Sequence, residues 1–483
     1  MKILGKFKNL FLRKVCLVAL APFFLYGCVS SHYDRSENFQ FSWKIGDFKS
    51  AAVEAENLSQ NGPKRDRLLY KLEEGSVKRL AGDLDGSVLA LQEASAEYDR
   101  WFGVHLKTEA RVSEAVSSVV GSAEWKPYKS RVYERVMMRV YQALNYLQLD
   151  DKGRARAEIF KSRQAIEDSR EIWKKELATA QSNMKKKGVD LDQGINDKNY
   201  NPLSEERMRI RAMVPSNLPD YVNPAAIYLE SLYFLRTGSR RDDFEKASFS
   251  LRQLSALYPK NEWIQDDFTE AKKGMPVSDS VTYVFFETGR APVRVEKRFD
   301  LPIVFFANQA RIPYLGIALP SLKTNDQFLS GLRIKATTLA KPVQTKVLAD
   351  MDAIVAKEFD KDYPIELSRA ISGALVKGGL QYLATDSVRS ENDTTRAIVG
   401  IGVSLLAQAT TKADLRAWGT LPKQIQFCKI KTPTDKKLTL EGVGATLKEE
   451  VALYPAASTN LVWVRSVSAH SPLKVVGVFP LEP

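Results

Sequence analysis

The chain has 483 residues, of which 44% are hydrophobic and 27% are charged, and its formal net charge is +13. This apolar content excludes a wholly disordered protein, and the length predicts two or three domains. The basic residues are scattered, and KKK at 185–187 is the only local run. Nucleic-acid sites prefer dense Lys/Arg clusters interleaved with aromatic residues. We therefore expect no nucleic-acid partner, whereas contact with acidic surfaces such as lipid head groups stays open.

The first 27 residues have the layout of a secretory signal peptide. Five Lys/Arg residues and no acidic residue precede VCLVALAPFFLY (15–26), an apolar run of 12 residues. A helix of that length spans ~18 Å, which is too short for a bilayer core of ~30 Å. Gly27, a small residue, then precedes Cys28. Removal of residues 1–27 takes away five positive charges and lowers the net charge from +13 to +8.

The stretch LYGC at 25–28 resembles the lipobox of bacterial lipoproteins. The resemblance implies cleavage between Gly27 and Cys28, a diacylglycerol thioether on the Cys28 sulfur, and acylation of the new amine with a chain such as palmitate. Several acyl chains anchor a protein stably. By analogy with the sorting rules of bacterial lipoproteins, Val29 in place of Asp favours the outer membrane. We expect a membrane-anchored lipoprotein that faces the periplasm, and an ordinary signal peptide with a chance cysteine is the alternative.

The remaining cysteines agree with this interpretation. Cys16 leaves with the signal peptide and Cys28 is blocked, so Cys428 would be the single free thiol. An intramolecular disulfide and a cysteine metal cluster are then excluded. Cys428 lies in QFCKIK (426–431), which alternates as a strand does, and it is predicted to be a packed side chain rather than a nucleophile.

After a polar tether at 28–40, residues 41–274 are predicted to form a helical repeat domain. GDFKSAAVEAENL begins at Gly46, and GDLDGSVLALQEA begins 36 residues later at Gly82. This period, with small residues where two helices cross, is typical of a tetratricopeptide-like α-solenoid; a generic antiparallel helical bundle is the alternative. DDFEKASFSLRQLSALYPKN (242–261) is the strongest copy. The positions that carry the register are Gly46, Ala51, Gly75, Gly82, Ser87, Ala94, Ala247 and Pro259.

The period is lost between residues 167 and 224, where we expect a polar helix followed by an irregular excursion. Such an insertion is either an element that faces a partner or a loop. If the repeats form a groove, its candidate lining is also open to a second interpretation, packing between helices. These candidates are Tyr70, Arg79, Tyr98, Tyr141 and Tyr228.

Residues 275–483 change to an alternating pattern that predicts an α+β domain. SVTYVFFETG followed by APVRVEKRFDLPIVFF indicates a β-hairpin around residues 288–290. Residues 348–384 predict a short and a long helix, and 394–418 predict a further helix whose uncharged part, 397–411, is too short for a membrane span. Five strands complete the chain. We therefore predict an antiparallel sheet with a helical insertion.

Few residues are placed for chemistry, and we predict no catalytic residue, metal or cofactor. Glu287, after an apolar strand, is the first candidate for the acid of a cell-wall carbohydrate hydrolase, and entry into a turn is the alternative. Asp393 is predicted to be a helix N-cap. Asp414, Arg416 and Trp418 could form a charge pair and an aromatic anchor near a surface. Because residues two apart do not face each other on a helix, we expect the pair to contact other elements. The histidines, which lack metal-ligand spacing, are His32, His105 and His470.

The lipobox, the repeat start GDF, FFETGRAPVRVEKRFDLP and ADLRAWGTLPKQIQ together resemble a family of uncharacterised bacterial lipoproteins. The resemblance implies a tetratricopeptide-like N-terminal half and a β-rich C-terminal half, and it implies no catalytic residues. We expect a protein-binding scaffold or accessory factor in cell-envelope assembly whose repeats bind an unknown envelope protein. A carbohydrate hydrolase and a peptidoglycan-binding or lipid-binding protein are the alternatives.

Overall fold

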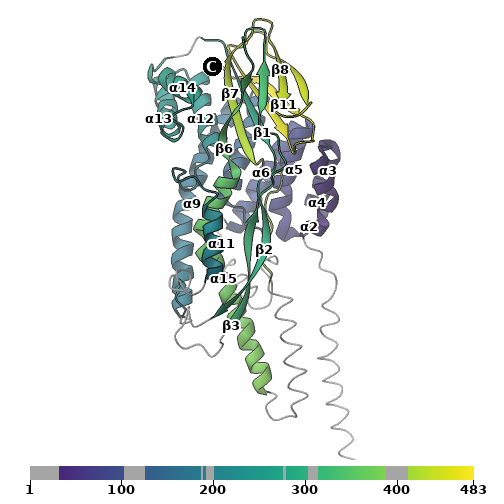
Figure 1. Cartoon of the computed structure of the whole chain (residues 1–483), viewed down its shortest axis with the longest axis vertical. Helices are drawn as coiled ribbons and strands as arrows, with labels where there is room; N and C mark the ends of the chain where they lie inside the picture. The colour runs from purple at the N-terminus through teal and green to yellow at the C-terminus, as the bar shows by residue number, and fades with distance from the viewer. Residues whose placement is uncertain are drawn as a thin grey trace, which may run out of the picture.

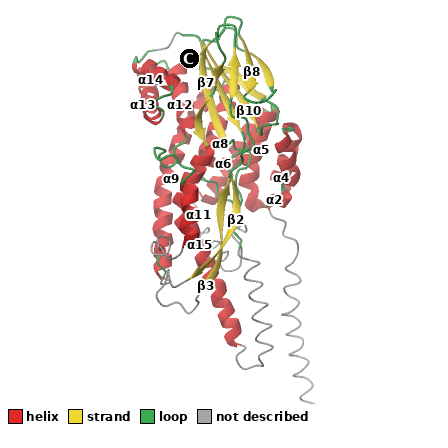
Figure 2. Cartoon of the chain, viewed as in Figure 1, coloured by secondary structure: helices red, strands yellow, loops and turns green. Residues whose placement is uncertain are grey.

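The computed structural model describes residues 32–102, 126–186, 189–191, 201–275, 279–302, 314–387 and 412–482. The helices of the first half precede the strands of the second half in the chain, which makes the fold α+β (Figures 1 and 2). Several predictions concern residues outside these ranges. They are the signal peptide with Gly27 and Cys28, His105, Asp393 and the uncharged run 397–411.

The expected tether at 28–40 is wrong for its described part, because residues 32–40 are helical. They form α2 (His32–Arg35) and the first part of α3 (Glu37–Ile45). Phe39 and Trp43 are spaced four residues apart and bury one face of α3 against the rest of the protein. The apolar residues of this short amphipathic stripe are too few to stand out from the polar residues around them.

Nine further α-helices follow before the sheet: α4 (Phe48–Asn61), α5 (Arg67–Ala81), α6 (Leu84–Phe102), α8 (Val132–Gln148), α9 (Lys152–Lys186), α11 (Asn201–Arg211), α12 (Pro224–Thr237), α13 (Arg241–Leu257) and α14 (Glu262–Lys272), among the described residues. Their boundaries follow from local chemistry. Asp47 caps α4 by accepting the Ser50 N–H, and Asn223 with Pro224 begins α12. Gly46 and Gly82 end α3 and α5 in the left-handed conformation, with φ of 83° and 92°.

Consecutive helices pack as hairpins, with α5 against α6, α8 against α9 and α12 against α13. Two small residues of the repeat register, Gly75 and Ser87, lie at the α5–α6 crossing. A Cβ atom on Gly75 would approach the Leu91 side chain to 2.5 Å, so the α5–α6 crossing requires glycine there. The Ser87 hydroxyl donates to the Gly75 carbonyl at 2.6 Å and accepts from the Asn145 amide of α8 at 2.8 Å. Ala51, Ala94 and Ala247 are fully buried.

The C-terminal half contains three sheets among its described residues. The largest has the order β11-β10-β1-β7-β6, formed by β11 (Lys474–Pro480), β10 (Thr459–Ser466), β1 (Val281–Thr288), β7 (Gln424–Lys431) and β6 (Lys346–Asp350). A four-stranded sheet contains β5 (Val343–Gln344), β4 (Leu332–Lys335), β8 (Lys437–Gly442) and β9 (Lys448–Ala452). Figure 2 shows the third, a ribbon of β2 (Val293–Pro302) and β3 (Tyr314–Lys323), running along the body below the other two.

Two sheet predictions are corrected by this topology. β1 and β2 do not form the expected hairpin, because β1 pairs with β7 and β10 while β2 pairs with β3. The largest sheet is mixed rather than antiparallel, since β1 and β10 run parallel. All eight residues of β1 are buried. A central strand needs partners on both sides, and these come from segments more than 130 residues further along the chain.

Where residues 348–384 predicted a short and a long helix, the structure has one helix, because α15 (Met351–Ser387) continues through Pro364. It leaves the sheet after β6 and packs along β3 and α9 (Figure 1). The 167–224 insertion also packs here, because Arg207 and Arg211 of α11 both bind Asp360 of α15. Helix α11 of this region therefore packs against α15 and stabilises its position.

One side of α5, α8 and α12 is covered by the protein's own C-terminal half. Tyr141 of α8 meets Trp418 edge to face at 5.8 Å between ring centroids, and Tyr228 of α12 lies 4.6 Å from Phe427 of β7. Arg79 of α5 lies over the Trp463 ring of β10. For these side chains the packing interpretation is confirmed. The two halves, which we divided at residue 274, share one hydrophobic core.

Candidate functional site

Glu287 lies in a closed ionic cluster at the junction of helices and sheet. Its side chain is 2% exposed, and its carboxylate lies 3.8 Å from the Arg465 guanidinium. Burial lowers the pKa of Arg79 and Arg465, and the Glu287 carboxylate acts in the opposite direction on both. Tyr141 completes the cluster, since burial and then the nearby Glu287 carboxylate raise its pKa. A carboxylate enclosed in this way has no space for a carbohydrate substrate.

The segment 412–418, expected to continue a helix, has no regular secondary structure and lies against the N-terminal helices. Arg416 binds Asp414 at 2.6 Å and Asp66, at the start of α5, at 2.7 Å. The predicted charge pair is thus confirmed, but its two members face each other because the backbone between them is not helical. Trp418 is buried, and its indole N–H donates to Ser76 at 3.1 Å. The predicted aromatic anchor, Trp418, therefore lies in the core rather than near a surface.

Carboxylates of the N-terminal helices also bind the segment that contains Arg416 and Trp418. Glu134 of α8 accepts the backbone N–H of Trp418 at 2.9 Å, and Glu73 of α5 accepts that of Gly419 at 2.7 Å. Burial raises the pKa of Glu73 to about 7. Buried acids on α5 and α8 therefore satisfy the backbone of a chain segment that belongs to the C-terminal half.

The remaining titratable candidates lie apart from one another. Cys428 is fully buried in β7, as predicted for a packed side chain, and burial raises its pKa to about 12. His32 stacks on Tyr70 inside the protein, and burial lowers its pKa to about 4. His470 is exposed in a turn. Among the described residues, no three His, Cys, Asp or Glu side chains are grouped as metal ligands would be.

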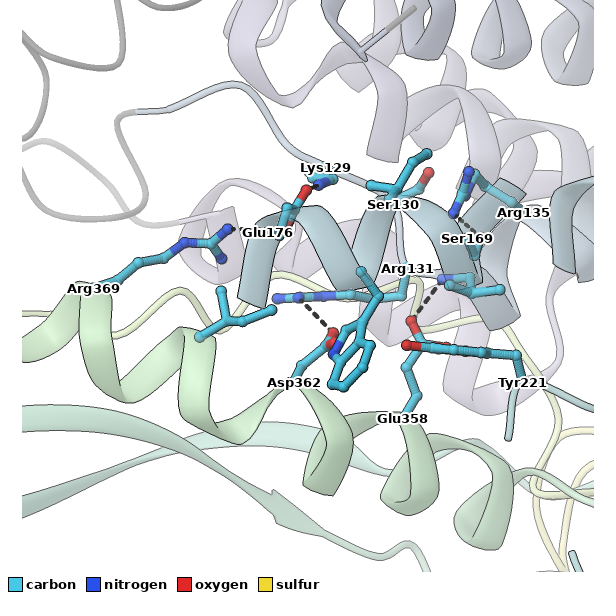
Figure 3. A pocket seen from close by; sticks show the side chains of 14 residues that line it. Lys129, Ser130, Arg131, Arg135, Ser169, Glu176, Tyr221, Glu358, Asp362 and Arg369 are labelled. Carbon is cyan, nitrogen blue, oxygen red and sulfur yellow. Dashed lines mark hydrogen bonds and ion pairs between the residues drawn. The ribbon is translucent and has the colours of Figure 1, made fainter. Parts of the chain in front are cut away.

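A small pocket of about 50 Å³ opens between α8, α9 and α15 (Figure 3). Glu358 and Asp362 of α15 point toward the start of α8, where Glu358 accepts the backbone N–H groups of Val132 and Tyr133 at 2.7 and 3.0 Å. A carboxylate at this position complements the helix dipole and two otherwise unpaired donors. The volume suits one or two water molecules and is far below the ~300 Å³ at which ligand sites begin.

The charges of this pocket predict a pH dependence of stability. Burial, and then the neighbouring Asp362 carboxylate, raise the pKa of Glu358 from 4.5 to about 7. The folded protein therefore holds this proton more tightly than the unfolded chain does. The stability that Glu358 contributes is complete below its unfolded pKa and is lost as the pH rises through about 7. We therefore expect the free energy of unfolding to fall between about pH 5 and about pH 8 by ~2 kcal/mol less in Glu358→Gln than in wild type.

Glu366, on the same helix, is the matched control for this measurement. Burial opposes its ionisation, but Arg131, Arg369 and Arg294 outweigh burial and lower its pKa to about 2. Glu366 stays ionised throughout the range, so Glu366→Gln should change the free energy of unfolding equally at both pH values. Guanidinium unfolding at each pH gives the comparison. Equal pH slopes for wild type and Glu358→Gln would contradict the assignment.

A larger groove, of about 370 Å³, lies between the α8–α9 hairpin and the α12–α13 hairpin. Its lining combines apolar side chains, such as Ile159 and Ile227, with the charged side chains of Arg139, Arg163 and Arg170. Arg163 binds Glu230 at 2.9 Å and lies over the ring of Phe249, which is 49% exposed. Sequence reasoning missed this groove, because its lining comes from four helices whose relative placement no local pattern specifies.

No protein-family model, no curated protein and no solved structure matches this chain. Within the described ranges, none of the helices combines the length and the hydropathy that crossing a membrane requires.

Proposed function

We propose that this protein is a lipid-anchored, periplasm-facing lipoprotein of the outer membrane and serves as a protein-binding scaffold in cell-envelope assembly. The proposed localisation rests on the layout of the signal peptide and on LYGC at 25–28, with Cys28 as the lipidated residue. The resemblance to uncharacterised bacterial lipoproteins supports the same assignment. The single observation that carries the binding role is the groove between the α8–α9 and α12–α13 hairpins.

The finer architecture that we propose is a tetratricopeptide-like solenoid. Three hairpins, α5–α6, α8–α9 and α12–α13, pack side by side in chain order, with small residues at their crossings. In such an array the first helix of each hairpin lines the inner surface. Here α5, α8 and α12 face the protein's own sheet and the segment after residue 412. We therefore assign the envelope partner to the groove that opens between the α8–α9 and α12–α13 hairpins.

The groove has the features of a protein-binding surface. An exposed aromatic ring, arginines and apolar side chains line it, and aromatic residues and arginine dominate binding energy at protein interfaces. Its volume lies within the range of ligand clefts. A hydrolase centred on Glu287 is a weaker proposal, because that side chain is 2% exposed. Peptidoglycan is a further candidate partner of the basic mature chain.

The experiment is affinity capture from envelope extract with the mature protein and with Phe249→Ser/Arg170→Glu. We expect wild type to retain a stoichiometric protein partner and the groove variant to lose most of it, at least ~10-fold. Tyr454→Ser, which removes a ring of equal exposure on the sheet half, is the control and should capture normally. Capture that is equal for all three proteins, or salt-sensitive co-sedimentation with sacculi and no protein, would count against the proposal.

A further inference from the structure

We propose that α3 lies on the surface of the membrane that carries the lipid anchor, with Phe41 and Ile45 in the interfacial layer. The inference rests on the proposed lipidation of Cys28 and names a second membrane contact on the folded body. Three observations carry it: an exposed apolar face, the short distance from that face to the anchor, and the rigid attachment of the intervening helix.

The exposed face belongs to α3. Phe41 is 64% exposed and Ile45 is 53% exposed. Four residues separate them, so they lie one above the other on the same side of the helix. Phe39 and Trp43 occupy the opposite, buried side. Figure 1 shows α2, α3 and α4 along one margin of the molecule, away from α9 and α15.

The distance to the anchor is limited by the sequence. Only residues 29–31 separate Cys28 from His32, the first residue of α2. Four Cα steps reach at most ~14 Å even when fully extended. The α2–α3 segment is nearly continuous, because the Ser36 N–H donates to the His32 carbonyl and the Gln40 N–H donates to the Ser36 carbonyl. Nine residues of helix place Phe41 a further ~14 Å from His32 at most.

The helix next to the anchor is fixed to the body, so the body cannot swing freely away from the membrane. His32 is 5% exposed and stacks on Tyr70 at 5.4 Å between ring centroids. The Tyr33 hydroxyl donates to the Leu415 carbonyl at 2.9 Å, and Arg35 binds Asp66 at 2.9 Å. A lipid attached this close to a fixed helix brings the adjacent surface of the protein to the bilayer.

Single exposed apolar residues are ordinary on protein surfaces, and it is the position beside the anchor that selects these two. Lys44 precedes Ile45 in the sequence of α3, and Lys49 is exposed on the following helix, as is the acidic N-cap Asp47. Ammonium groups at this site favour anionic head groups, while the ring and the aliphatic side chain insert below them. Asp34 and Glu37 lie nearer the anchor, so the expected contact is shallow and centred on the second half of α3.

The test uses the full-length, processed lipoprotein in vesicles of phosphatidylethanolamine and phosphatidylglycerol, with no other protein present. Phe41→Cys and Ile45→Cys are each labelled with a polarity-sensitive fluorophore. Labelling is specific because Cys428 is fully buried and Cys28 carries the lipid. Tyr454→Cys, on the loop after β9, is the control. We expect spin-labelled lipids to quench positions 41 and 45 about threefold more than position 454.

Equal quenching at all three positions would overturn the proposal. So would a photo-cross-link from position 41 to a protein in native membranes without lipid quenching in vesicles. A mass of the N-terminal peptide that lacks acyl chains would remove its premise and overturn it as well. Because the vesicles contain no partner, loss of binding in the α8–α9/α12–α13 groove leaves this result unchanged. Unfolding midpoints of the labelled proteins that match wild type exclude a folding defect.

Discussion

Arg416→Met should lower the free energy of unfolding by about 3–5 kcal/mol, among the largest effects we expect for a single substitution. The Arg416 guanidinium is 2% exposed and binds Asp66 and Asp414, and it donates to the Lys126 carbonyl at 3.0 Å. Removing it leaves the Asp414 carboxylate without the cation that it binds, and leaves the fully buried Asp66 carboxylate with Arg35 alone. Because Asp66 begins α5 and Arg416 belongs to the C-terminal half, the loss falls on the junction of the two halves.

The measurement is the midpoint and slope of guanidinium unfolding. Lys335→Met is the matched control, since the Lys335–Glu441 pair at 2.7 Å is half-exposed and should contribute less than ~1 kcal/mol. Asp66→Asn/Arg416→Met, which removes both charges of the bond, should recover part of the loss. An Arg416→Met protein as stable as the control variant would show that this ion pair does not hold the halves together.

Glu287→Gln should lower the free energy of unfolding by about 3 kcal/mol. We expect the substitution to leave muropeptide release unchanged, because wild type should release none. The substitution leaves Arg79 and Arg465 both buried without their shared counter-charge. The amide of glutamine can still accept a hydrogen bond, so the lost stability reports the charge. Glu262→Gln is the control, because Glu262 pairs with Lys346 at an exposed site.

Two assays separate the structural role of Glu287 from a catalytic one. Chemical unfolding reports the loss of stability, and release of soluble muropeptides from sacculi reports hydrolysis. We expect a lower unfolding midpoint and no release by either protein. A Glu287→Gln protein of normal stability, together with release by wild type that the variant lacks, would establish the hydrolase instead.

Local signals in the sequence were sufficient for many elements of the fold. Gly46 and Gly82 mark helix ends because only glycine adopts φ near +90° without strain. The small residue at 75 marks a close helix crossing, and alternation marked the last five strands, β7 to β11. The α+β class follows from the order of these patterns.

The long-range arrangement could not be predicted in the same way. The pairing of β1 with β10 and β7 joins residues that are far apart in the chain, and so does the ion pair between Arg416 and Asp66. Turn residues after β1 suggested a hairpin, but a buried eight-residue strand gains more from two neighbours in a sheet. For Tyr141 and Tyr228 the residue types fitted an open groove as well as a core, and only the tertiary packing separates the two.

The most direct test of the account is photo-cross-linking in intact cells from a benzoylphenylalanine residue placed at position 249. The C-terminal half covers one side of α5, α8 and α12, so the partner should bind in the groove between the α8–α9 and α12–α13 hairpins. We predict one major protein adduct from position 249 that Arg170→Glu weakens, and no such adduct from position 454, whose native side chain is equally exposed. The same adduct from both positions, or none from position 249, would contradict the account.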